Sequence, residues 1–196
     1  MEHVTHKKRI ITIAGRPGSG KSTASKAIAE QLGYEHFSSG DLFRAIGRER
    51  GIDVTQTNQA AERDEEIDRL VDERQEEMGR TQDQLVIDGR LAWHFIPGSF
   101  KVYLDLDLEI AARRILANMD PVRKAHEHIP DDPKQYAAAL QHRLGLEATR
   151  YKSKYGVGVH DQSNFDLVID TGNHSPEEVK NLILDAYHKW LAANDV

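Results

Sequence analysis

The 196-residue sequence contains no cysteine. A chain without cysteine can form neither a disulfide nor a metal site built on thiolates. At this length one domain buries enough apolar surface to fold without such cross-links. Disulfides rarely form in a reducing compartment such as the cytoplasm, so the absence of cysteine is consistent with a cytoplasmic protein. We therefore expect the protein to be cytoplasmic.

Long apolar runs are missing as well. No run approaches the roughly 18 residues that a membrane-spanning helix requires. The first apolar run, Ile10–Ala14, is too short to be the core of a signal peptide. We therefore expect a mature, soluble protein without a membrane partner.

Basic residues do not outnumber acidic ones. The sequence has 26 Lys and Arg against 32 Asp and Glu, which gives a formal net charge of −6. General nucleic-acid binders usually carry a basic excess, so we expect no nucleic-acid partner. Local basic clusters can still bind phosphate groups. With 30% charged residues the surface is polar, and we expect a monomer.

Short apolar runs separated by helical segments dominate what is present. Near-continuous Ile, Leu and Val is typical of strands buried on both faces of a parallel sheet. The alternation predicts a three-layer α/β domain. The predicted strands are 10–14, 35–38, 85–88, 101–106 and 166–170, and the predicted helices are 22–32, 41–50, 62–78, 108–119, 133–155 and 176–193. Two stretches, about 39–84 and 120–162, interrupt the alternation and are expected to cross the ligand edge of the sheet.

Residues 15–22 match the phosphate-binding pattern G-x-x-x-x-G-K-S and lie between a predicted strand and a predicted helix. In this loop the backbone N–H groups and the helix N-terminus face an anion. Lys21 brings a positive charge to the β- and γ-phosphates, and the Ser22 hydroxyl can bind Mg²⁺. The motif predicts a nucleoside triphosphate and Mg²⁺ site made by Gly15, Arg16, Pro17, Gly18, Ser19, Gly20, Lys21, Ser22 and Thr23.

Asp88 ends the third predicted strand and is followed by Gly89 and Arg90. Its carboxylate could hold the metal through a water, or it could simply cap a turn. A cation beside the γ-phosphate suits an anionic acceptor better than an attacking water. This favours a kinase over an ATPase.

Further arginines indicate a second phosphate site, because the guanidinium can grip a phosphate with two parallel hydrogen bonds. Arg44, Arg90 and Arg114 lie near the predicted loop edge. Spacing of i, i+4 and i+7 places Arg143, Glu147 and Arg150 on one helix face. A solvated face with an internal salt bridge is as compatible with this spacing as a binding face. Phosphoryl transfer needs positioning and charge neutralisation, which arginines and a lysine supply.

The chain resembles the nucleoside monophosphate kinases, and among them the cytidylate kinases, especially the short archaeal-type form. The resemblance covers nearly the whole chain. Besides the P-loop it rests on residues 39–44 (Ser-Gly-Asp-Leu-Phe-Arg), 66–68, 72–75, 88–92 (Asp-Gly-Arg-Leu-Ala), the helix with Arg143, Glu147, Arg150, Tyr151 and Tyr155, and residues 166–171.

This resemblance implies a P-loop fold with a five-stranded parallel sheet. The implied core is 1–38, 84–119 and 160–196, with a monophosphate-binding insertion at 39–83 and a lid at 120–159. The implied reaction transfers the γ-phosphate of ATP to CMP and, we expect, to dCMP. An adenylate-type or other small-acceptor kinase is the alternative within enzymes. An ATP-binding regulatory module without a second nucleotide site is the alternative outside them.

Residue roles also follow from the resemblance. Lys21, Arg90, Arg150 and Mg²⁺ are expected to stabilise the phosphoryl group in transit, with Asp88 on the metal side. Arg114 matches a donor-side arginine. Base choice is expected to depend on side chains of the insertion such as Asp68, Asp72 and Arg74. The expected acceptor-binding residues are Ser39, Arg44, Asp68, Asp72, Arg90, Arg143 and Glu147. Glu147 departs from the bacterial form, which has an aspartate. We interpret Trp93 as a packing residue, with lining of the acceptor pocket as the alternative.

Overall fold

The structure is a computed structural model that describes residues 8–52, 57, 66–119, 124 and 129–194. Five strands form one sheet in the order β2-β3-β1-β4-β5, and every pairing is parallel. The predicted parallel α/β architecture is therefore confirmed. The strands are β1 (Ile10–Gly15), β2 (Glu35–Ser38), β3 (Leu85–Asp88), β4 (Phe100–Asp105) and β5 (Leu167–Asp170).

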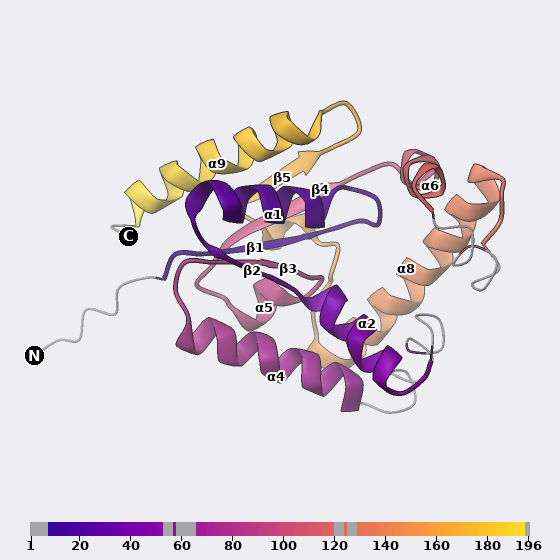
Figure 1. Cartoon of the computed structure of the whole chain (residues 1–196), viewed down its shortest axis with the longest axis horizontal. Coiled ribbons are helices and arrows are strands. Elements are labelled where there is room, and N and C mark those ends of the chain that lie inside the picture. The colour runs from indigo at the N-terminus through magenta and orange to yellow at the C-terminus, as the bar shows by residue number, and fades with distance from the viewer. Residues whose placement is uncertain (1–7, 53–56, 58–65, 120–123, 125–128, 195–196) are drawn as a thin grey trace, which may run out of the picture.

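The central strands are covered on both faces. Every residue of β1 and of β3 is buried, as their continuous apolar runs predict. Ile11 and Ile13 of β1 belong to a core shared with α1 (Lys21–Leu32) and α9 (Pro176–Ala193). On the opposite face, Ile10 packs with residues of α4 (Glu66–Thr81) and α5 (Ala92–Phe95). Figure 1 shows α1 and α9 on one side of the sheet and α4 and α5 on the other.

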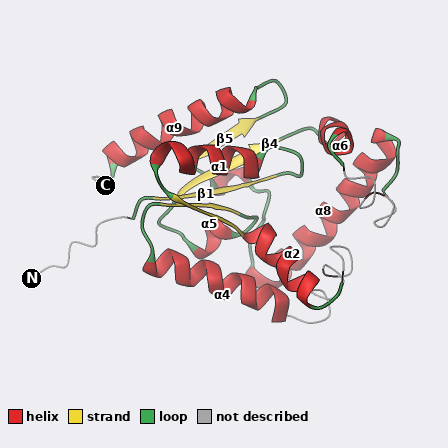
Figure 2. Ribbon diagram, viewed as in Figure 1, coloured by secondary structure: helices red, strands yellow, loops and turns green. Residues whose placement is uncertain are grey.

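Three further helices lie beyond the carboxyl ends of the strands (Figure 1). They are α2 (Ser39–Glu49), α6 (Leu108–Ala117) and α8 (Pro133–Tyr155). An apolar cluster that includes Ala111 and Leu140 joins α6 to α8. In Figure 2 the carboxyl ends of the strands point to the right, toward the side of the molecule that holds α2, α6 and α8. In parallel α/β folds this edge is where ligands bind.

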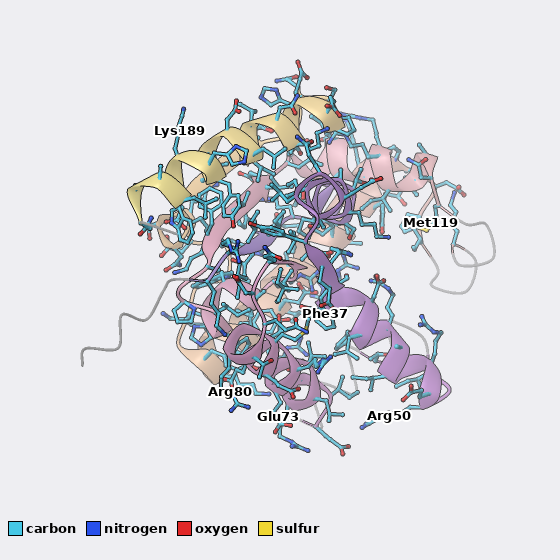
Figure 3. The ribbon with its side chains drawn as sticks, turned by 60° about the vertical axis from the view of Figure 1, so that its left-hand side comes forward. Phe37, Arg50, Glu73, Arg80, Met119 and Lys189 are labelled. Carbon is cyan, nitrogen blue, oxygen red and sulfur yellow. The ribbon has the colours of Figure 1, made fainter. Side chains whose placement is uncertain are left out.

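The polar face of α4 points away from the sheet. Glu73 and Arg80 are exposed and project outward in Figure 3, whereas Ile67 and Met78 on the opposite stripe are buried. A helix with one narrow apolar stripe is expected to pack in this way. The predicted helix 62–78 begins among residues outside those described, and its observed end is Thr81.

Element boundaries differ from the predictions by a few residues. The α2 helix begins at Ser39 instead of 41, because the Ser38 hydroxyl caps it by accepting from the Asp41 N–H. The β4 strand begins at Phe100 and β5 at Leu167. Sequence periodicity did not predict α5 or the short 3₁₀ helix Gln162–Asn164, since both are too short to show a pattern. Among the described helices, none combines the length and apolarity needed to cross a membrane.

Candidate active site

The phosphate-binding loop leaves β1 at Gly15. The backbone φ at this residue is 144°, and a Cβ would lie 2.2 Å from the carbonyl oxygen of Leu104. Glycine is therefore required where the loop passes β4. The loop ends at Gly20, whose φ is 85° and which offers no side-chain cap to α1. The first N–H groups of α1 consequently remain available for an anion.

Lys21 starts α1 and points back into the loop. Its Nζ donates to the carbonyl of Arg16 at 2.8 Å. Burial, together with the nearby positive charge of Arg90, lowers the pKa of Lys21 to about 7. A phosphate group beside it would favour the charged ammonium. The lysine is thus placed to gain a full charge when an anion binds.

Asp88, at the end of β3, lies beside the loop and is 4% exposed. Its Oδ1 accepts from the hydroxyls of Ser22 at 3.2 Å and Ser38 at 3.1 Å. Its Oδ2 lies 2.8 Å from Nε2 of His36. Hydroxyl and carboxylate oxygens are the hard ligands that Mg²⁺ prefers, so Ser22 and Asp88 fit a magnesium site. The contact between His36 and Asp88 was not predicted from the sequence.

A cavity of about 290 Å³ opens beside Lys21 and Ser22. Every residue predicted to bind the acceptor lines it, and so do Asp88 and Arg150, which the sequence placed in the reaction. The lining residues include Lys21, Ser22, Ser39, Arg44, Asp68, Asp72, Asp88, Arg90, Arg143, Glu147 and Arg150. The structure therefore brings residues from five separate segments of the chain to one cavity.

The helix face of Arg143, Glu147 and Arg150 is turned into this cavity. Glu147 is 5% exposed, which rules out the alternative of a solvated face. Its Oε1 lies 2.7 Å from Nη1 of Arg90 and 3.9 Å from Nε of Arg143. Burial alone would lower the pKa of Arg90, but Glu147 and Tyr151 together outweigh that effect and raise it. Arg90 consequently remains a cation inside the site.

Contacts between α4 and α8 close one side of the cavity. Asp68 Oδ2 lies 3.7 Å from Nη1 of Arg150 and 3.8 Å from Nζ of Lys154. The Tyr155 hydroxyl donates to Asp72. Burial raises the pKa of Asp72 to about 6, although the hydrogen bond from Tyr155 acts in the opposite direction.

A second cavity of about 420 Å³ lies on the other side of the loop. Arg114 lines it, as predicted for a donor-side residue, and its Nη2 donates to the carbonyls of Thr171 at 2.9 Å and Gly172 at 3.2 Å. Gly18, Ser19, Gly20, Thr23 and Arg114 all line this cavity, together with His174 of the turn before α9.

Some predicted loop residues contribute no side chain to either cavity. The Nε of Arg16 lies 2.7 Å from Asp105, and the side chain lines a separate hollow beside β4. Gly15 and Pro17 are not among the described residues that line either cavity. The predicted binding roles of Arg16 and Pro17 would therefore depend on their backbone N–H and carbonyl groups, of which Pro17 has only the carbonyl.

Other residues of the site escaped prediction. Gln75 of α4 is buried and accepts from the Ser39 hydroxyl at 2.8 Å. It lines the cavity of about 290 Å³, which we call the acceptor-side cavity after the predicted acceptor residues in its wall. Gln75 lies in the motif 72–75 that carries the family resemblance, but no binding role was predicted for it. Trp93 is buried in an apolar cluster, and its indole N–H donates to the Arg90 carbonyl at 2.9 Å. The interpretation of Trp93 as a packing residue is therefore confirmed, and its hydrogen bond holds the backbone of Arg90 in place.

Comparisons with known proteins agree with this geometry. Residues 14–129 match the family described as an AAA domain. The chain is 34% identical over 189 residues to the cytidylate kinase of Natronomonas pharaonis, covering 95% of this chain and 93% of the relative. It is 35% identical over 177 residues to the cytidylate kinase of Methanothrix thermoacetophila, covering 90% and 96%.

Solved structures share the fold at lower identity. An uncharacterized protein from Eubacterium ventriosum superposes with a TM-score of 0.65 at 16% identity, covering 92% of this chain and 99% of that one. The shikimate kinase from Acinetobacter baumannii in complex with shikimate gives a TM-score of 0.59 at 19% identity, covering 94% and 95%. The fold is thus that of P-loop kinases. Taken with the identity to the archaeal relatives over nearly the whole chain, this shows that the chain belongs to the cytidylate kinase family.

Proposed function

We propose that this chain transfers the γ-phosphate of ATP to CMP, and to dCMP, giving ADP and the diphosphate. The observation that carries the proposal is the shared cavity: Lys21 of the phosphate-binding loop and the acceptor-side Arg90 line the same space. A triphosphate held on the loop and a monophosphate held by Arg44 and Arg90 would face each other there. Names of the relatives support cytosine as the acceptor base.

Charge neutralisation accounts for the residue roles. Lys21, Arg90 and Arg150 supply three positive charges around the cavity, which suits the charge spread over a transferring phosphoryl group. The acceptor phosphate is ionised at neutral pH and needs no general base. Mg²⁺, when bound, neutralises charge on the donor phosphates. Ser22 would hold it directly and Asp88 through a water.

Base selection fits the carboxylates of α4. Cytosine carries an exocyclic amino group that donates hydrogen bonds, whereas uracil has a carbonyl oxygen at the same position. Asp68 and Asp72 line the cavity and, as carboxylates, only accept. They would bind the cytosine amino group and repel the uracil carbonyl. Arg143 and Glu147 are left for the sugar end of the acceptor.

Two segments outside the core would close over the cavity when substrates bind. We assign 39–83 to the monophosphate-binding insertion and 120–159 to the lid, around a core of 1–38, 84–119 and 160–196. The bond from Tyr155 of α8 to Asp72 of α4 joins the two excursions across the cavity. Such closure would exclude water that competes with the acceptor. Because residues of one chain line the cavity, we further propose that the protein acts as a monomer. We also propose that it acts in the cytoplasm, which is consistent with its cysteine-free sequence.

The test is ADP formation with ATP and a panel of acceptors: CMP, dCMP, UMP, AMP and GMP, with shikimate as a fold-related control. We expect CMP and dCMP to give the highest kcat/KM and Lys21→Ala to give no turnover. Highest activity with AMP would establish the adenylate-type alternative. ADP release that ignores every monophosphate would instead favour the regulatory module.

A further inference from the structure

His36 lies beside the predicted metal site without being part of it. Strand β2 pairs with β3 so that His36 is opposite Val86 and Ser38 is opposite Asp88. Residues 36 and 38 are two apart on one strand and therefore project from the same face. As a result both side chains reach the Asp88 carboxylate from the side of β2.

The two oxygens of Asp88 are held differently. Oδ1 is shared by the hydroxyls of Ser22 and Ser38, while the His36 ring nitrogen holds Oδ2 at 2.8 Å. A carboxylate only accepts hydrogen bonds, so Nε2 of His36 must carry the proton. The bond is largely shielded from water, since the two side chains are 19% and 6% exposed.

This arrangement fixes the rotation of the carboxylate. If Oδ2 were not held, the two hydroxyl bonds to Oδ1 would be left to oppose rotation about the terminal torsion of Asp88, which has only a weak rotational preference. Held by His36, it keeps Oδ1 directed at Ser22, the side where the metal is expected. Hydrogen bonds behind a metal-side group orient it in this way, and their loss commonly reduces metal affinity about 10–100-fold.

We propose that His36 is a positioning residue for magnesium, acting through Asp88. It does not touch the metal, the nucleotide or the acceptor. This inference rests on one part of the proposed function, namely that the protein binds ATP together with Mg²⁺. It therefore requires no knowledge of the acceptor.

Three substitutions separate this role from simple packing. The amide nitrogen of His36→Gln stands the same number of bonds from Cα as Nε2 of histidine, so it can still donate to Asp88. The nitrogen of His36→Asn stands one bond closer to the backbone and falls short. His36→Leu removes the donor altogether. His188→Leu, at an exposed histidine of α9, is the matched control.

The measurement is the affinity for a fluorescent ATP analogue, N-methylanthraniloyl-ATP, in EDTA and in Mg²⁺, with no acceptor present. We expect equal affinities in EDTA for all variants, because the loop is unchanged. The gain in affinity on adding Mg²⁺ should fall about tenfold or more in His36→Asn and His36→Leu. It should be retained in His36→Gln and His188→Leu.

Electron paramagnetic resonance of Mn²⁺ bound with ATP should show the same order of metal affinities. The proposal is overturned if His36→Asn and His36→Leu keep the wild-type gain. It is equally overturned if His36→Gln loses the gain as fully as His36→Asn. Failure of the protein to phosphorylate CMP would contradict the proposed acceptor and leave these binding results intact.

Discussion

Arg90 and Glu147 form an ion pair inside the acceptor-side cavity, with 2.7 Å between Nη1 and Oε1. A substrate phosphate would need the same guanidinium. In the protein without substrate, the Glu147 carboxylate therefore occupies the place of an anion and keeps the buried arginine compensated. If Arg90 binds the acceptor phosphate as proposed, that phosphate would displace Glu147, whose carboxylate would then be available to the sugar.

Replacing Arg90 by alanine should weaken the acceptor far more than ATP. One desolvated, charged contact costs roughly 2–5 kcal/mol when truncated. The substitution also removes the ion-pair partner that lies nearest to the buried Glu147 carboxylate, while Arg143 stays at 3.9 Å, so the melting temperature should fall as well. Steady-state kinetics with CMP and ATP varied separately, and thermal unfolding, give the two readings. Arg113→Ala, at an exposed pair of α6, is the control, and an unchanged CMP KM in Arg90→Ala would show that the acceptor site is misplaced.

Replacing Glu147 by glutamine should make inorganic phosphate a better ligand. The substitution keeps the size of the side chain but removes the charge that competes for Arg90. A charge-assisted hydrogen bond contributes about 1.5–3 kcal/mol, so phosphate should inhibit at a concentration lower by about tenfold. Inhibition of CMP phosphorylation by phosphate measures this, with Glu109→Gln on the surface of α6 as the control. Equal inhibition constants would mean that Glu147 does not compete with an anion.

Local patterns predicted the parts of this site that are continuous in sequence. The phosphate-binding loop is one uninterrupted motif, and Arg90 follows Asp88 directly at a strand end. The helix spacing placed Arg143, Glu147 and Arg150 together, although only the structure shows that this face is buried.

The remaining parts depend on pairings between distant segments. His36 reaches Asp88 because β2 lies next to β3 in one particular register. Gln75 reaches Ser39 because α4 packs against the start of α2. No periodicity within a segment encodes either neighbour. For the same reason the sequence could not show that the Arg16 side chain turns away to Asp105.

Asp72 should make stability depend on pH. Its pKa in the folded protein is about 6, above the ordinary value of 3.8. The folded state thus binds the proton more tightly, and the stability contributed by this group is complete below about pH 4. It is lost as the pH rises through 6.

Asp72→Asn removes this titration and should therefore flatten the change in melting temperature between about pH 4 and pH 7. Calorimetry of the wild type and the variant across that range, taken as a difference curve, isolates the group. Glu73→Gln, on the exposed side of the same helix (Figure 3), is the control and should leave the curve unchanged. Parallel curves for wild type and Asp72→Asn would contradict the raised pKa.

Gly89 should tolerate no side chain, although it is not in a left-handed conformation. A Cβ at this position would lie 2.4 Å from the Ser39 hydroxyl oxygen and 3.3 Å from Oε1 of Gln75. Gly89→Ala must therefore displace Ser39 and disturb its bond to Gln75. Overpacking of this kind costs about 1–3 kcal/mol, and because Ser39 lines the acceptor-side cavity, the KM for CMP should rise while the KM for ATP changes little.

Gly98→Ala is the matched control for that substitution, because a Cβ there would meet no atom within 4 Å. It should leave both KM values and the melting temperature close to those of the wild type. If Gly89→Ala raised both KM values equally, the clash would act on the whole strand edge, including Asp88. A selective rise for CMP instead ties Ser39 to the acceptor, since Ser39 lines the acceptor-side cavity and not the cavity along Gly18, Ser19 and Gly20.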